Sequence, residues 1–207
     1  NVESAYNVFD AAGAAGARIV WASSESCYGT VFAEDDWLPD RLPIDEETPA
    51  EPEDPYGLSK VVGEEVAAAA ARRHGVRAVS LRLSWVTFPG DERRREARET
   101  FDPATAEPSG NCWSSVDVRD VVAAIEAAIA PETDIDGHET VLIVATENFL
   151  GRDTAATIEA VRGELPPDCD LDGDESAFDC SKAKRLLGWE PEHSWRDDVE
   201  TDGESEN

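Results

Sequence analysis

Tyr56 and Lys60 are the two residues of this sequence whose types and spacing could do chemistry together. They stand four positions apart on an expected helix, so their side chains share one face. A free tyrosine has a pKa of about 10, and a cation held beside a phenol favours the phenolate. The pair could therefore move a proton to or from a hydroxyl, although an amphipathic surface pair has the same spacing.

Ser24 is the third candidate for chemistry. It ends residues 18–24, a short apolar run that predicts a buried parallel strand. Open α/β sheets bind their ligands at the carboxyl ends of strands. The Ser24 hydroxyl could hold a substrate oxygen while Tyr56 moves the proton, and a hydride acceptor would then complete the oxidation of an alcohol.

Helices and strands are expected to alternate around these residues. Helical spacing of apolar residues predicts helices over 1–15, 55–73, 116–130, 153–163 and 181–187. Short apolar runs predict strands over 18–24, 78–86 and 140–146, with irregular stretches at 29–54 and 87–112. Asp54 suits the N-cap of the second helix, and Pro55 suits its first position. This order predicts an α/β fold with a parallel sheet whose first strand has an unpaired edge.

Acidic residues dominate the charge of the chain. Asp and Glu total 46 against 18 Lys and Arg, for a formal net charge of -28. Nucleic acid and anionic membrane surfaces are poor partners for such a chain, because both need a basic face. Six Trp and clean apolar runs favour a fold over disorder. We interpret the acidity as a halophile's solvated surface, so removing salt should unfold the protein.

Cysteine and histidine do not form a recognisable metal or disulfide pattern. The four Cys lack CxxC spacing and the three His are scattered, so free cytosolic thiols are expected. No segment approaches the roughly 20 apolar residues of a membrane span, and no signal peptide is visible, which favours a cytoplasmic protein.

Several further residues are expected to be structural. The acidic stretch 168–179 is similar to a calcium loop, but it lacks the final glutamate and a preceding helix, so we expect no metal. Cys27 is expected to be a small buried thiol. Surface positions are expected for three histidines, and packing against the C-terminal segment for two tryptophans: His74, His138, His193, Trp189 and Trp195.

Three motifs occur in a specific order. They are Ala22–Gly29 (ASSESCYG), Pro43–Glu46 (PIDE) and Pro52–Lys60 (PEDPYGLSK). Together they resemble the extended short-chain dehydrogenase/reductase family, and within it the NAD-dependent sugar epimerase/dehydratase branch. Phe178–Ala183 and Leu187–Pro191 resemble the C-terminal segment of that family, so the likeness extends to about Arg196.

The resemblance implies a role for each matching position. Ser24 would orient the substrate, Tyr56 would be the acid/base, and Lys60 would be its partner and a ribose ligand. The resemblance implies that the cofactor is bound by Asn1, Ser23, Tyr56, Lys60, Leu83, Trp85 and Val86. It implies that the substrate meets Ser24, Glu25, Ser26, Trp85 and Arg93. The cluster of arginines that includes Arg93 could equally be a solvated basic turn.

The family's fold is Rossmann-like, and this chain would hold part of it. Residues 1–150 would form a partial NAD(P)-binding domain, 151–200 a small C-terminal substrate-side segment, and 201–207 a disordered acidic tail. The family begins with a strand and a glycine-rich turn that cradles the pyrophosphate, and no such turn occurs in this sequence. A fragment, a mis-started reading frame or a decayed copy would explain this. NAD is favoured over NADP, with weak or no binding by this chain alone.

Trp85 stands where the family carries an asparagine that meets the diphosphate of nucleotide sugars. With the short stretch that follows it, this favours a smaller substrate, a free sugar or sugar acid, as in the similar uronate dehydrogenases. The expected function is an NAD(P)-dependent oxidoreductase or epimerase acting on a sugar hydroxyl, with a homodimer as one possible assembly. The alternative is a truncated, non-catalytic remnant that binds a partner chain through its exposed sheet edge.

Overall fold

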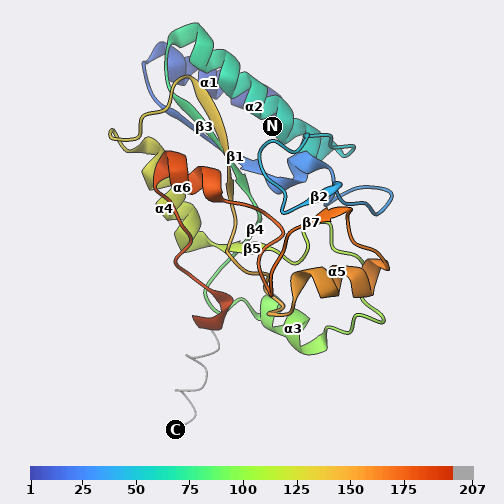
Figure 1. Ribbon diagram of the computed structural model, residues 1–207. Helices are drawn as coiled ribbons and strands as arrows, with labels where there is room; N and C mark the ends of the chain where they lie inside the picture. Colours follow the sequence, from blue (N-terminus) through green and yellow to red (C-terminus); the bar gives the residue numbers. More distant parts are fainter. Residues whose placement is uncertain (198–207) are drawn as a thin grey trace.

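The computed structural model describes residues 1–197 of the chain (Figure 1). The tail over 201–207, predicted to be disordered, lies outside those residues. A parallel sheet with the strand order β1-β3-β6 forms the centre. Its strands are β1 (Ile19–Ser24), β3 (Ala78–Leu83) and β6 (His138–Ile143). This confirms the predicted α/β class and its partial parallel sheet.

The carboxyl ends of the three strands are level with one another. Ser24 pairs in register with Leu83, and Leu83 with Ile143. Parallel strands in register bring their last residues to one edge of the sheet, where ligands bind in open α/β folds. β1 pairs only with β3, so within residues 1–197 its other edge is open, as expected.

Helices cover both faces of this sheet, as Figure 1 shows. On one face, α1 (Val2–Ala14) and α2 (Pro55–His74) pack with Ile19 and Ala78 around Phe9 and the alanines of α2. On the other face, α4 (Val118–Ile129) and α6 (Ser181–Leu187) pack against Val79, Leu81, Val141 and Ile143. Alternate strand residues therefore enter opposite cores, as expected for a parallel sheet buried on both sides.

Shorter elements gather beyond the carboxyl ends of the strands (Figure 1). They are η1 (Glu25–Tyr28), the parallel pair β4 (Trp85–Thr87) and β5 (Ser115–Asp117), the parallel pair β2 (Arg41–Leu42) and β7 (Asp168–Cys169), and α3 (Glu92–Thr100) and α5 (Thr154–Arg162). A separate apolar core joins them, with Tyr28, Ile44, Trp113 and Phe149 among its buried members. This layer caps the sheet edge at which Ser24 lies.

The strand predicted over 140–146 is found at His138–Ile143, and two further predictions are wrong. The strand predicted over 78–86 is interrupted at Ser84, after which Trp85–Thr87 leaves the central sheet to pair with β5. The stretch predicted to be irregular, 87–112, contains α3, because the Asp91 carboxylate caps the Arg93 N–H at 3.0 Å and strong helix formers follow. The arginines that could have formed a basic turn therefore lie on a helix.

The three histidines predicted at the surface are partly buried, and each has a partner. His74 Nε2 lies 2.9 Å from an Asp10 carboxylate oxygen, and His138 Nε2 lies 2.8 Å from the Ser80 hydroxyl. His193 Nδ1 lies 2.7 Å from Asp120. Their positions depend on contacts between distant segments, so local polarity was a poor guide.

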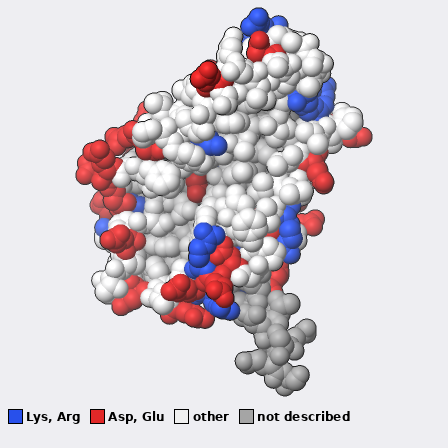
Figure 2. Space-filling model, turned by 180° about the vertical axis from the view of Figure 1, so that it is seen from behind, with Lys and Arg blue, Asp and Glu red and all other residues white. Residues whose placement is uncertain are grey.

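The packing of the two tryptophans was predicted correctly. The Trp189 indole N–H donates to the Asp120 carbonyl at 2.9 Å, and that of Trp195 donates to the Asn148 carbonyl at 3.0 Å. Cys27 is fully buried, and the four thiols are free. Within residues 1–197, no helix is long and apolar enough to cross a membrane, and no cluster of metal-ligating side chains occurs. Figure 2 shows acidic side chains around a broad uncharged centre on one face of the molecule.

Candidate active site

A cavity of about 560 Å³ lies at the carboxyl ends of β1 and β3. Its walls come from β1 and η1, the first turns of α2, the 83–86 segment, the loop at 31–32 and the turn at 109–114. Most predicted site residues line it together: Ser23, Ser24, Glu25, Ser26, Tyr56, Lys60, Leu83, Trp85 and Val86. Residues as far apart in the sequence as Glu25 and Asn111, which are separated by 86 positions, thus meet in one hollow.

The start of α2 is fixed against η1 by its own residues. The Asp54 carboxylate accepts hydrogen bonds from the N–H groups of Tyr56 and Gly57, both at 2.8 Å, and Pro55 takes the first helical position, as predicted. A Cβ on Gly57 would lie 2.5 Å from the Ser26 carbonyl oxygen. Glycine at 57 is therefore what allows the helix to approach η1 closely enough to place Tyr56 beside Ser24.

Tyr56 and Lys60 share one face of α2, as the four-residue spacing predicted. The Lys60 ammonium lies 5.3 Å from the centre of the Tyr56 ring and donates to the Ala22 carbonyl at 2.6 Å. Burial lowers the pKa of Lys60. The Tyr56 side chain is 44% exposed, and Phe32 packs edge-on against its ring at 6.0 Å between centroids. The phenol is thus open to a ligand beside a held cation.

Ser24 ends β1 and caps η1. Its hydroxyl accepts from the Ser26 N–H at 3.2 Å and donates to the Ser26 hydroxyl at 3.1 Å. The turn that follows closes at Gly29, whose φ of +88° favours glycine, and where a Cβ would lie 2.5 Å from the Glu51 carbonyl oxygen. The serine-rich sequence after the strand therefore forms a tight turn that holds its hydroxyls at the cavity wall.

Two predicted site residues lie outside the cavity wall. Asn1 donates from its amide to the Ser59 hydroxyl at 3.0 Å, one residue from Lys60. Arg93 lies on α3, where its guanidinium binds Asp91 at 3.0 and 2.6 Å and stacks 4.9 Å from the centre of the Trp85 ring. Arg93 therefore supports the Trp85 wall from behind, and Asp91 neutralises its charge.

Glu25 is a fully buried carboxyl group at the cavity. Only 4% of the residue is exposed, and Oε1 accepts from the Asn111 amide at 3.2 Å. Neither Glu25 Oε2 nor the Ser84 hydroxyl makes a hydrogen bond of standard length and angle among the described residues, although the Ser84 hydroxyl and the Trp85 N–H lie near the Glu25 carboxyl group. Burial raises the pKa of Glu25 to about 8, and the Ser84 hydroxyl and the Asn111 amide oppose that shift.

A second buried carboxylate lies beneath the cavity floor. Glu64, one turn after Lys60 on α2, forms two bonds with the Arg82 guanidinium, at 3.0 and 2.8 Å, and accepts the Ser23 hydroxyl at 2.5 Å. Burial alone would lower the pKa of Arg82, but its hydrogen bonds with Glu64 raise it. This pair ties α2 to β3 and to the residue before Ser24.

Sequence reasoning missed five wall residues: Ala22, Val31, Phe32, Ser84 and Asn111. Ala22 and Ser84 adjoin predicted residues, so extending each motif by one position would have found them. Asn111 carries no local signal, since it reaches Glu25 from 86 positions away. The neighbouring Cys112 and Trp113 have φ of 48° and 57°, a strained conformation for non-glycine residues that sets this turn apart.

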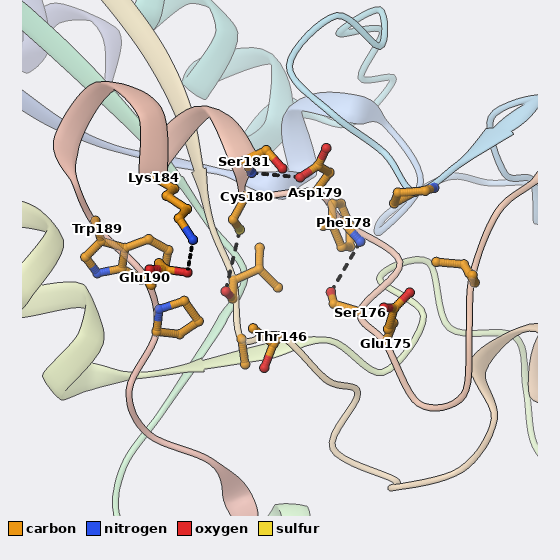
Figure 3. A pocket seen from close by; sticks show the side chains of 15 residues that line it. Thr146, Glu175, Ser176, Phe178, Asp179, Cys180, Ser181, Lys184, Trp189 and Glu190 are labelled. Atoms are coloured by element: carbon orange, nitrogen blue, oxygen red, sulfur yellow. Dashed lines mark hydrogen bonds and ion pairs between the residues drawn. The ribbon is translucent and has the colours of Figure 1, made fainter.

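A second cavity, of about 360 Å³, lies where the end of β6 meets α6 (Figure 3). Its polar side chains are paired within the protein: Lys184 binds Glu190 at 2.7 Å, and the Asp179 carboxylate accepts the Ser181 N–H at 2.7 Å. None of the unpartnered buried polar atoms of the described residues lines it. Its walls are therefore satisfied without a ligand, unlike those around Glu25.

An open parallel sheet with a Tyr–Lys pair and a serine at its carboxyl edge defines a chain of the short-chain dehydrogenase type. The family model described as "NAD dependent epimerase/dehydratase family" matches residues 1–143, and the chain belongs to this family.

Two curated relatives match parts of the chain. It is 35% identical over 105 residues to an L-arabinose 1-dehydrogenase (NAD(P)(+)) of Haloferax volcanii, covering 48% of this chain and 41% of the relative. It is 25% identical over 216 residues to a UDP-glucose 4-epimerase of Lactobacillus helveticus, covering 87% of this chain and 61% of the relative. The chain thus spans less than two thirds of the length of each relative.

Solved structures share the fold. A short-chain dehydrogenase/reductase superfamily protein of Agrobacterium tumefaciens with bound NAD matches with a TM-score of 0.63 and 27% identity, over 97% of this chain and 70% of that one. A UDP-galactose 4-epimerase matches with a TM-score of 0.61 and 28% identity, over 96% and 66%. A mutated uronate dehydrogenase, at 22% identity and a TM-score of 0.59, shares the fold alone.

Proposed function

We propose that this chain carries the catalytic part of an NAD(P)-dependent oxidoreductase or epimerase that oxidises a sugar hydroxyl. One observation carries the proposal: Ser24, Tyr56 and Lys60 converge on one cavity at the carboxyl edge of the parallel sheet. Family membership and relatives named as a sugar dehydrogenase and a sugar epimerase support it.

Each of the three residues has a part in this proposal. Tyr56 is exposed to the cavity and takes the proton of the substrate hydroxyl. Ser24 holds the same oxygen by a hydrogen bond, since its hydroxyl can turn from Ser26 toward a ligand. The Lys60 ammonium stabilises negative charge on the Tyr56 oxygen. The nicotinamide, when bound, accepts the hydride from the carbon that bears the hydroxyl.

The residues present fit the nicotinamide-ribose end of the cofactor. A lysine ammonium has three donors, and Lys60 uses one of them on the Ala22 carbonyl, so others can meet ribose hydroxyls. Leu83, Trp85 and Val86 offer an apolar wall to a flat ring. Asn1, near Ser59, stands at the same end of α2.

Four of the described helices do not fit the pyrophosphate end of the cofactor. Pyrophosphate is bound at a helix N-terminus that offers unoccupied N–H groups after a glycine-rich turn. The helices α2, α3, α4 and α5 each begin with an aspartate whose carboxylate already accepts those N–H groups: Asp54, Asp91, Asp117 and Asp153. Negative charge at these positions repels phosphate, so these helix ends offer no second anchor for a dinucleotide.

Calorimetric titration with NAD tests the cofactor assignment. The 207-residue chain should bind NAD weakly or not at all, and a chain extended through any coding sequence that precedes Asn1 in frame should bind it more tightly. Micromolar affinity in the 207-residue chain would contradict the weak-binding expectation. No binding by either chain would contradict the oxidoreductase proposal itself.

We propose a substrate smaller than a nucleotide sugar. Trp85 packs edge-on against Phe149 at 5.3 Å and against the Arg93 guanidinium, so a held bulky ring stands at the position where the resemblance places an asparagine that meets the diphosphate. The similarity to an L-arabinose dehydrogenase supports a free sugar, whereas the epimerase relatives are named for nucleotide sugars. Competition between UDP-galactose and galactose for the cavity distinguishes the two classes.

A non-catalytic partner-binding role is the second candidate, and the open edge of β1 favours it. Ile19 N–H bonds to the Arg77 carbonyl at 2.9 Å, so strand alternation directs the N–H groups of Val20 and Ala22 to the open side. Such an edge accepts another strand. Amide hydrogen exchange tests this: slow exchange at both positions that becomes fast on dilution supports a partner strand, and fast exchange at all concentrations excludes self-pairing.

A further inference from the structure

Glu25 and Ser84 form an unsatisfied polar pair inside the cavity. Burying a polar group without a partner destabilises the folded state, so such atoms at a cavity wall point to a ligand that completes them. Glu25 Oε2 and Ser84 Oγ are both unpartnered among the described residues, and both belong to residues that line the cavity with Tyr56. Glu25 directly follows Ser24, and Ser84 directly follows Leu83, the residue that pairs in register with Ser24.

The hydrogen bonds of Asn111 fix which oxygen of Glu25 carries the proton. The Asn111 side-chain oxygen accepts from the Ser109 hydroxyl at 2.7 Å, and its amide nitrogen donates to the Ser114 carbonyl at 3.1 Å. The amide nitrogen therefore also donates to Glu25 Oε1, at 3.2 Å. A proton on the neutral acid then sits on Oε2, the oxygen without a partner, which makes Oε2–H a donor.

No cation among the described residues pairs with Glu25 to stabilise its ionised form. Lys60 donates to the Ala22 carbonyl and Arg93 is paired with Asp91, and no ion pair of Glu25 occurs in residues 1–197. Tyr56 and Lys60 from α2 and Cys112 from the 109–114 turn are the other titratable groups around it. Burial raises the pKa of Glu25 to about 8 and that of Cys112 to about 12, so both are neutral at pH 7.

We propose that Glu25, as a neutral acid, and the Ser84 hydroxyl bind a second hydroxyl of the sugar, and that the cavity thereby selects neutral sugars over sugar acids. This inference rests on the proposed function and names its substrate class. A neutral acid and a hydroxyl both donate and accept, which matches a sugar hydroxyl. A substrate carboxylate against the buried Glu25 would need a cation beside it, and the cation among the described wall residues, Lys60, is instead held at the Ala22 carbonyl beside Tyr56.

Galactose and galacturonate are a matched pair of probes, since they differ only in a hydroxymethyl or carboxylate group. Binding of each is measured by calorimetry, with and without NAD, in the wild-type protein, in Glu25→Gln and in the exposed control Glu132→Gln. At pH 7 galactose should bind about tenfold or more tightly than galacturonate, as expected when a buried polar group is left unpaired. Equal or tighter binding of galacturonate would overturn the inference.

The pH profile isolates Glu25 from the other titrating groups. In the wild-type protein and in Glu132→Gln, galactose affinity should fall about tenfold for each pH unit above the pKa of Glu25. A glutamine side chain cannot ionise, so Glu25→Gln should lose that pH dependence of galactose affinity. Any pH dependence that comes from Lys60 or Tyr56 should remain. Identical profiles in Glu25→Gln and the wild type would overturn the inference.

Infrared difference spectroscopy gives a readout that needs no turnover. A protonated-carboxyl band should be present at pH 6, disappear as the pH rises past 8, and be absent from Glu25→Gln. If the proposed function failed and the Glu25 inference held, the results would differ from these. Tyr56→Phe would keep full turnover, while the protonated-carboxyl band and the preference for galactose would both persist. A wild-type protein that binds neither sugar overturns the present inference whatever its redox activity.

Discussion

Two buried glutamates, Glu25 and Glu64, lie at the candidate active site, the first in the cavity wall and the second bonded to the wall residue Ser23. They are 4% and 6% exposed, and both lie near the end of β1. Both carboxylate oxygens of Glu64 accept hydrogen bonds, from Arg82 and from Ser23. Glu25 accepts from the Asn111 amide on one oxygen, and its other oxygen makes no hydrogen bond of standard geometry among the described residues. Residue type and burial are the same, and only the partners differ.

The difference in partners indicates different roles: Glu64 holds the surrounding structure in place, and Glu25 is available to bind a ligand. Glu64 is satisfied by the protein, so its contribution is to hold α2, β3 and the Ser23–Ser24 end of β1 in place. Glu25 is only partly satisfied and borders the cavity, so its remaining oxygen is available to a ligand. Buried polar groups that the fold leaves unsatisfied mark functional sites better than burial alone does.

The largest effect is expected from Glu64→Ala. Removing one partner of a buried pair leaves the Arg82 charge uncompensated, which costs about 3–5 kcal/mol of the free energy of unfolding. Urea unfolding followed by circular dichroism measures it. Glu65→Ala, exposed and adjacent on the same helix, is the control and should change little. A loss below about 1 kcal/mol in Glu64→Ala would show that the pair is not the support assigned to it.

Glu25→Gln should alter stability in a pH-dependent way. The folded state holds the Glu25 proton up to about pH 8 and the unfolded state only to about 4.5, so the folded state binds more protons between them. Wild-type stability from this group is therefore complete below pH 4.5 and falls by about 1.4 kcal/mol per pH unit as the pH rises to 8.

Urea unfolding at several pH values tests the direction in which stability changes with pH. The stability of Glu25→Gln relative to the wild type should rise steadily with pH across that window, and Glu132→Gln should run parallel to the wild type. Parallel curves for Glu25→Gln and the wild type would mean that Glu25 is already ionised in the folded protein, and would remove its contrast with Glu64.

Ser23→Ala and Ser84→Ala should give the smallest effects, and unequal ones. The Ser23 hydroxyl donates to the Glu64 carboxylate, so its loss should cost about 1–2 kcal/mol. The Ser84 hydroxyl has no partner among the described residues, so its removal should be neutral or slightly stabilising. Thermal or urea unfolding compares the two directly. Equal losses would show that Ser84 is satisfied in solution and is not waiting for a ligand.

Local sequence signals were enough for much of the fold. Aspartate and proline before Tyr56 predicted the start of α2, and the apolar runs predicted the three strands of the parallel sheet. Ser24, Tyr56 and Lys60 follow from these elements, because a strand end and the first turns of a helix fix where they lie. The structure brings these three residues to one cavity, and their catalytic roles stay a prediction.

Long-range contacts account for what the sequence missed. The break at Ser84 follows from pairing of Trp85–Thr87 with β5, a partner 30 residues away along the chain. Asn111 reaches Glu25 through a strained turn, and the Glu64–Arg82 pair joins a helix to a strand. None of these has a local periodicity, and so the distinction between a satisfied and an unsatisfied glutamate appears only in three dimensions.

Sugar-dependent reduction of NAD is the most direct measurement of the assigned chemistry. The assay compares three proteins on a panel of neutral aldoses: the wild type, Tyr56→Phe and the exposed control Tyr6→Phe. Each is expressed with any in-frame coding sequence that precedes Asn1. Loss of the acid/base should reduce turnover by about 100-fold or more in Tyr56→Phe and leave Tyr6→Phe unchanged. Two results would contradict the assignment of this cavity as a sugar-oxidising active site. One is that Tyr56→Phe keeps the turnover of the wild type, and the other is that the wild type turns over none of the sugars.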